Sequence, residues 1–295
     1  MKTWKHFTFA AFLVIFVILA FITCDTGNNG SETYTVTFDS DGGTSITAQT
    51  VAENGRVTEP AAPTKENNIA GLYMGTPDDY TFAGWYNGDT KWDFNAPVTA
   101  NISLKAKWVS PAPAVDISTS YGNNIFDKAF SYLNGNEGIY TLLLDEDVET
   151  EGTGLIGNTS YSSGTTIANL TITGIGEERT ITPQGYESGG NTYYNSIFDL
   201  MGEGNILTIG KHITLKGAND ETVIEKSPLV HIEDGVHFIM LPVSKITGHT
   251  STSNSSHDSG VINIGSWYLS HGYFTMEGGE ISGNNTTYCI ALWEG

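Results

Sequence analysis

The chain has few cysteines, few basic residues and none of the short motifs that bind nucleotides or metals. Its two cysteines, Cys24 and Cys289, cannot build a disulfide framework. It has 13 Lys and Arg residues against 33 Asp and Glu residues, and the resulting formal net charge of −20 repels nucleic acid. The sequence contains no glycine-rich phosphate loop, zinc-binding cluster or nucleophilic serine elbow. We therefore expect neither a nucleic-acid partner nor a cofactor.

The remaining composition is typical of a folded, exported β-protein. Only 16% of the residues are charged, but 39% are hydrophobic, which is enough to fill a core. Glycine is abundant, with 34 residues, and proline is scarce, with 9. A prior of one domain per ~150 residues leaves room for two domains in a chain of 295 residues.

The N-terminus has the pattern of an export signal. Lys2 and Lys5 form a basic start, and residues 7–22 are then apolar except for Thr8. A helix that spans a bilayer needs about 20 apolar residues, so this shorter run favours a signal peptide over a permanent anchor.

The apolar run ends just before Cys24 and a flexible polar segment, and this arrangement resembles a bacterial lipoprotein signal. The resemblance implies that residues 1–23 are a signal peptide and that Cys24 is the lipid attachment site. Residues 24–32 would then be a flexible tether. The alternative is an uncleaved anchor with an incidental cysteine, and both interpretations export the protein.

Residues 33–109 have the pattern of a small β domain. Two alternating segments, 34–38 and 46–51, flank a glycine-containing turn and predict a β-hairpin. Further marks are the segment FAGWY at 82–86 and the closing strand NISLKAKW at 101–108. Together these motifs resemble the Listeria-Bacteroides repeat, also described as the internalin B-repeat type.

The resemblance implies a β-grasp-like module of bacterial surface proteins that acts in spacing or adhesion rather than catalysis. Residues 67–79 form a longer insertion than the repeat requires. We expect this insertion to be a loop peculiar to this chain.

Two features of this domain have a functional and a structural interpretation. Asp39 and Asp41 could bind calcium, but Gly43 and Thr50 stand where an EF-hand loop needs oxygen ligands, so a turn is favoured. Four aromatic residues could form a sugar-stacking platform, but in so small a domain they are expected to form the core. These aromatic residues are Trp85, Tyr86, Trp92 and Trp108.

Residues 120–295, after a linker at 110–119, have the pattern of a solenoid. Apolar residues at helical spacing predict one short helix over 124–133, and short β runs separated by Gly, Asn and Ser follow it. Three segments, 207–219, 238–250 and 274–286, echo one another at a period typical of stacked repeats. The echo predicts about five coils and one inward row formed by Ile209, Met240 and Met276.

The last of these echoes, GYFTMEGGEISGN at 272–284, resembles the coils of pectin-lyase-like surface proteins. The resemblance implies a right-handed parallel β-helix with the helix at 124–133 covering its N-terminal end, where strand edges would otherwise be exposed. Because the sequence stops in apolar residues without a capping element, we expect a β-helix truncated at its C-terminus.

The solenoid shows no catalytic pattern. Its only arginine, Arg179, lies in a turn-like stretch, and the acidic run from Asp145 to Glu151 is expected to be a solvated turn. Six histidines are scattered without the tight spacing of a metal site, so no metal is expected. They are His212, His231, His237, His249, His257 and His271.

The sequence therefore predicts a non-catalytic, lipid-anchored cell-surface protein for adhesion, ligand binding or surface scaffolding. We expect its partners to be the membrane, through the lipid on Cys24, and surface glycans or proteins of a host or a neighbouring cell. Two alternatives stay open. A carbohydrate-active β-helix enzyme requires carboxylates clustered in one groove, and a purely structural spacer requires no groove at all.

Overall fold

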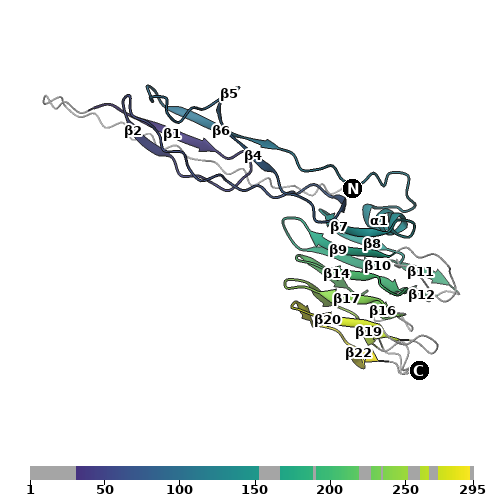
Figure 1. Cartoon of the computed structure of the whole chain (residues 1–295). Helices are drawn as coiled ribbons and strands as arrows, with labels where there is room; N and C mark the ends of the chain where they lie inside the picture. Colours follow the sequence, from purple (N-terminus) through teal and green to yellow (C-terminus); the bar gives the residue numbers. More distant parts are fainter. Residues whose placement is uncertain are drawn as a thin grey trace, which may run out of the picture.

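The computed structural model describes residues 31–152, 167–188, 191–218, 227–233, 235–251, 260–265 and 272–292. These residues form a small mixed β-sheet domain, one helix and a β-solenoid whose strands stack along one axis (Figure 1). The predicted mainly β fold class is confirmed. Within the described ranges, no helix is long and apolar enough to cross a bilayer. The predicted signal peptide and Cys24 lie outside the described residues.

The first domain is a five-stranded sheet with the order β2-β1-β6-β4-β5. Its centre pairs β1 with β6 in parallel, and the other pairs are antiparallel, as expected for a β-grasp-like module. The predicted second strand is shorter than expected and begins later, because the turn after β1 extends into a longer loop. The strands are β1 (Thr33–Asp39), β2 (Gln49–Ala52), β4 (Thr81–Asn87), β5 (Thr90–Lys91) and β6 (Ile102–Val109).

The core of this sheet is aromatic. Trp85 is buried, and its ring lies 4.9 Å from that of Phe38 in an edge-to-face arrangement. Trp92 and Trp108 are half-buried against the same cluster. The structural interpretation is therefore confirmed for the three tryptophans, whereas Tyr86 is not part of this cluster and the Nζ atom of Lys107 lies 4.5 Å from the centre of its ring.

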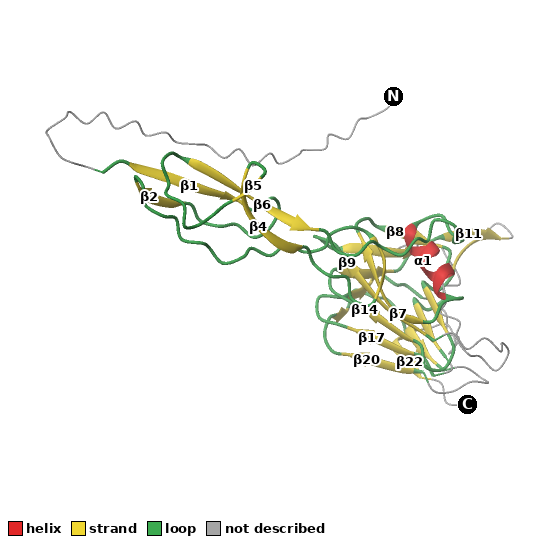
Figure 2. Ribbon diagram, turned by 45° about the horizontal axis from the view of Figure 1, so that its top comes forward, coloured by secondary structure: helices red, strands yellow, loops and turns green. Residues whose placement is uncertain are grey.

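The predicted helix is α1 (Ile125–Leu133), and it caps the solenoid. The side chain of Asn124 begins the helix by accepting a hydrogen bond from the backbone N–H of Asp127. Phe126 and Phe130 are buried, with ring centroids 5.8 and 5.7 Å from that of Phe198. The helix thus shields the apolar interior at one end of the coil, beside β7 (Gly138–Leu144), as Figures 1 and 2 show.

Three parallel sheets form the walls of the solenoid, in the orders β20-β17-β14-β9-β7, β21-β18-β15-β10-β8 and β22-β19-β16-β13. They give about four turns in the described residues, against about five expected. A separate hairpin pairs β11 (Gly185–Ser188) with β12 (Asn191–Tyr194). The remaining strands are β8 (Val148–Thr150), β9 (Ala168–Gly174), β10 (Arg179–Pro183), β13 (Phe198–Leu200), β14 (Ile206–Ile209), β15 (Ile213–Lys216), β16 (Val230–Ile232), β17 (His237–Met240), β18 (Lys245–Thr247), β19 (Gly260–Ile264), β20 (Tyr273–Met276), β21 (Glu280–Ile281) and β22 (Tyr288–Leu292).

The register of the stacked strands follows the echoes in the sequence. Ile209 pairs with Met240 and Met240 with Met276, so the predicted apolar row is confirmed. Ile209 and Met240 are fully buried, but Met276 is 45% exposed because it lies in the last described coil. Met240 is therefore the better position at which to test this row.

The insertion at 67–79 is not the expected loop. It contains β3 (Gly71–Met74), which pairs antiparallel with β7 and adds a sixth strand to the first sheet of the solenoid. Leu72 is fully buried and belongs to the hydrophobic core of the solenoid, not to that of the repeat domain. The insertion thus covers the strand edge of the first coil and joins the two domains.

Candidate functional site

A cavity of about 1200 Å³ lies between the repeat domain and the solenoid, and we call it the junction cleft. Its floor is the outward face of β7 and β9, with Thr141, Thr171 and Thr173. Its opposite wall comes from the loops of the repeat domain and includes Lys65 and Tyr80. The cleft exists because β3 holds the repeat domain against the first coil.

Strand alternation places the threonines on the floor. Successive side chains of a strand point to opposite faces, so the buried Leu170 and Ile172 of β9 face the core while Thr171 and Thr173 face outward. The hydroxyl of Thr141 donates a hydrogen bond to the carbonyl of Gly75, 2.8 Å away, and fixes the end of the insertion. The floor is therefore built on paired strands and not on loops.

A glycine allows the turn at one end of the cleft to pack closely. A Cβ atom on Gly174 would lie only 2.4 Å from the carbonyl oxygen of His212, which is closer than atoms can approach. His212 itself has a φ of 62°, in the left-handed region. Both residues line the cleft, so the shape of this end depends on them.

The charges around the junction cleft balance. The positive charges of Lys65 and Lys211 are balanced by the negative charges of Glu66 and Asp79, whereas the whole chain has a formal net charge of −20. The Nζ atom of Lys65 donates to the carbonyl of Asp41 at 2.8 Å and lies 4.7 Å above the ring of Tyr80. The cleft is thus a locally neutral surface on an acidic protein, with both polar side chains and the apolar side chains of Pro77, Tyr80 and Ile175.

One wall of the cleft also contains a buried amide. Asn67 is 9% exposed, its backbone N–H donates to Asp79 at 3.0 Å, and its side-chain oxygen accepts from the N–H of Ile69 at 3.1 Å. Its Nδ2 atom is buried without a hydrogen-bond partner in the protein. Most buried polar atoms are paired, so this donor is unusual.

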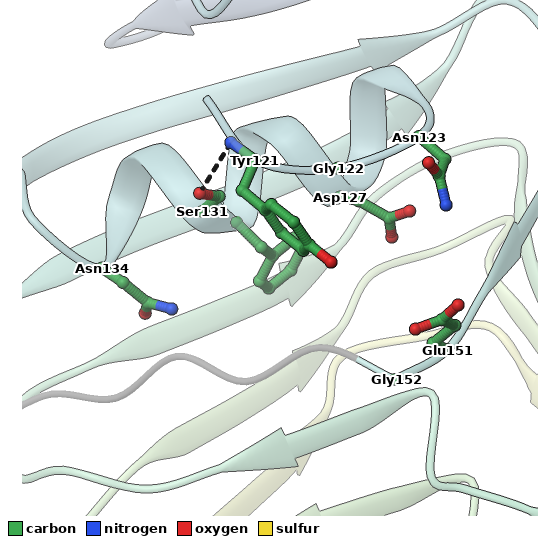
Figure 3. Close-up of a pocket in the computed structure, with 9 residues that line it drawn as sticks. Tyr121, Gly122, Asn123, Asp127, Ser131, Asn134, Glu151 and Gly152 are labelled. Atoms are coloured by element: carbon green, nitrogen blue, oxygen red, sulfur yellow. Dashed lines mark hydrogen bonds between the residues drawn. The ribbon is translucent and has the colours of Figure 1, made fainter. Parts of the chain in front are cut away.

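A second, smaller cavity of about 360 Å³ lies beside α1, and we call it the cap pocket (Figure 3). Asp127 and Glu151 both line it, on the same side of the ring of Tyr121 in this view. The carboxylate of Asp127 accepts hydrogen bonds from Asn124 Nδ2 at 3.0 Å and Thr150 Oγ1 at 2.9 Å. Asp127 therefore has a structural role, because its hydrogen bond to Thr150 connects α1 with β8 of the first coil.

A third cluster lies on the sheet formed by β13, β16, β19 and β22. The ring of His231 lies between two carboxylates, with Nδ1 3.1 Å from Asp199 and Nε2 3.1 Å from Glu233. Burial lowers the pKa of His231, but the hydrogen bonds to both carboxylates outweigh it and raise the pKa to about 10. The imidazole is therefore charged at neutral pH and is not a general base.

The cluster around His231 does not resemble a metal site. The two carboxylates contact opposite nitrogens of the ring, so the three side chains do not converge on one point. Across the described ranges, no group of three or more His, Cys, Asp or Glu side chains is arranged to hold a metal ion. Of the six histidines considered from the sequence, His257 and His271 lie outside the described residues.

The other candidate residues have structural surroundings. The acidic run is not the expected turn throughout, because Val148–Thr150 forms β8, but its acidic side chains are exposed. Asp147 accepts a hydrogen bond from the backbone N–H of Thr180 at 2.8 Å. Arg179 begins β10 instead of lying in a turn, and its guanidinium bonds to Glu177 at 3.1 Å. Asp41 forms an ion pair with Lys105 at 2.7 Å, and this hydrogen bond lowers the pKa of the Asp41 carboxyl.

The junction cleft and the His231 cluster were both missed by sequence reasoning. The outward threonines of β9 were visible as an alternation, but the sequence does not show what faces them. Asp199 and His231 are one repeat apart and pair in register, so the coil period could have placed them side by side.

Comparison with known proteins bears on the first domain. Residues 34–107 match the Listeria-Bacteroides repeat domain. Internalin H of Listeria monocytogenes is 45% identical over 82 residues, which make up 26% of this chain and 12% of Internalin H. The chain thus spans about an eighth of the length of this curated relative. No solved structure matches the chain. The predicted repeat domain is confirmed, and these likenesses suggest a surface or exported protein.

Proposed function

We propose that this protein is an exported surface protein of the adhesion type, which binds a ligand in the junction cleft without turning it over. Three features support the proposal: the internalin-like repeat, the junction cleft and the N-terminal export pattern. The proposed organisation is a repeat domain at 33–109 and a solenoid at 120–295 of the pectin-lyase-like type. A lipid on Cys24 anchors both to the envelope.

The observation that carries the proposal is the pairing of β3 with β7. This pairing makes the repeat domain structurally continuous with the first coil, and Leu72 extends the core of the solenoid into the insertion. A simple spacer needs neither this contact nor a cleft between its domains. The geometry therefore favours a binding module over a spacer.

The second candidate is a carbohydrate-active enzyme, and the cap pocket is the observation that favours it. Asp127 and Glu151 both line this pocket. General acid–base catalysis needs two carboxyl groups free to exchange protons with a substrate. Both oxygens of Asp127 instead accept hydrogen bonds from Asn124 and Thr150, so the binding function is the better supported of the two.

Labelling of intact cells tests the proposed location. Cells that express the full chain are incubated with an antibody against the repeat domain and, in parallel, with an antibody against a cytoplasmic protein as a control for lysis. We expect the first antibody to label intact cells and the second to label only lysed cells. Labelling by the first antibody only after lysis would contradict a surface location.

A further inference from the structure

The size of the junction cleft sets the size of the ligand. Pockets for small molecules measure roughly 300–1,000 Å³. The cleft, at about 1200 Å³, lies above this range and extends along two adjacent strands of the solenoid. A ligand that fills the cleft is therefore larger than a single sugar ring or another small molecule of similar size.

The charge of the cleft excludes ligands of high charge. Two lysines and two carboxylates line it, so neither a polyanion nor a polycation meets a complementary field there. The formal net charge of −20 on the whole chain also repels polyanions. A neutral ligand is the one that the electrostatics favour.

The polar groups of the cleft offer hydrogen bonds of both kinds. The hydroxyls of Thr171 and Thr173 can donate and accept, and the carboxylate of Asp79 accepts. A ligand that presents hydroxyl groups at short, regular intervals matches this mixture.

A peptide fits the cleft less well. Peptides that bind along a sheet need an unpaired strand edge, or else apolar pockets for anchoring side chains. On the floor of the cleft, β7 is already paired with β3 and β9, and β9 is paired with β7 and β14. Leu143 on the floor is buried, whereas Pro77, Tyr80 and Ile175 present apolar surface in the cleft, so it is the paired strands that disfavour a peptide.

From these observations we infer that the junction cleft binds a neutral oligosaccharide of several residues. The inference rests on the proposed binding function and adds the class of ligand. Thr171 and Thr173 form the hydroxyl-binding floor, and the β3 insertion holds the opposite wall in place. Replacement of these threonines by valine removes the hydroxyl groups while it keeps the shape and the β-branching of the side chains.

The experiment measures binding of the purified full chain to arrayed glycans and then, by calorimetry, to soluble hexasaccharides. The probes are cellohexaose, xylohexaose and mannohexaose as neutral ligands, and hexagalacturonate as an acidic ligand. The test variant is Thr171→Val combined with Thr173→Val. The matched control is Thr208→Val, because Thr208 pairs with Thr171 in register but lies in the next coil and does not line the cleft.

We expect a neutral glycan to bind, the double variant to lower its affinity about tenfold, and Thr208→Val to leave the affinity within about twofold. Failure of every neutral glycan on the array, a preference for the acidic ligand, or equal affinity of the double variant and the wild type would each overturn the inference. Labelled intact cells without glycan binding would refute the ligand class alone. Unlabelled intact cells would refute the proposed surface function.

Discussion

Replacement of Leu72 by alanine tests whether the repeat domain caps the solenoid. Leu72 lies on β3, in the repeat domain, but its side chain is 0% exposed within the core of the solenoid. Loss of a buried leucine costs about 2–5 kcal/mol through lost burial and the cavity left behind. Met74, two residues further along the same strand, is 70% exposed, so Met74→Ala should change the free energy of unfolding by about 0.5 kcal/mol or less.

Hydrogen exchange followed by mass spectrometry locates the effect, and denaturant unfolding measures its size. In Leu72→Ala we expect faster exchange in both β3 and β7, because the two strands are paired and lose a shared core contact. In Met74→Ala we expect exchange like that of the wild type. The reasoning is refuted if the two variants lose similar free energy, or if exchange in β7 is the same in both.

Three further predictions concern other parts of the chain. Metabolic labelling with a fatty-acid analogue should mark the wild type and not Cys24→Ser, and equal labelling of both would rule out lipid attachment at Cys24. Met240→Ala should lower the free energy of unfolding by about 2–5 kcal/mol and Met276→Ala by much less, since Met240 is 0% and Met276 45% exposed; equal losses would contradict the register. The pKa of His231 is raised from 6.5 to about 10, so its contribution to stability is complete below pH 6.5 and is lost as the pH rises through 10. Denaturant unfolding should show the wild type losing stability over this range relative to His231→Gln, and parallel profiles would refute the ion-pair assignment.

The repetitive parts of the fold could be predicted from the sequence because local patterns determine them. Spacing of apolar residues located α1 to within one residue, and the echoes around Ile209, Met240 and Met276 gave the register of three coils. These features depend on contacts between residues close in sequence or one period apart.

The β3 insertion could not be predicted in this way. Its strand has only four residues without alternating polarity, and its partner β7 lies about seventy residues away. Nothing local distinguishes such a segment from a loop, because the tertiary contact with the open first coil makes it a strand. The junction cleft depends on the same contact, so the sequence could indicate Thr171 and Thr173 as outward residues but not as a binding floor.

Product analysis tests the central claim, that the protein binds a ligand without turning it over. The purified full chain is incubated with neutral and acidic polysaccharides, with and without calcium, and reducing ends and unsaturated products are measured over time. The proposed function predicts that neither product appears, even with a glycan that binds. Appearance of either product, and its loss on replacement of Glu151 or another acidic residue of the solenoid, would show that the protein is an enzyme.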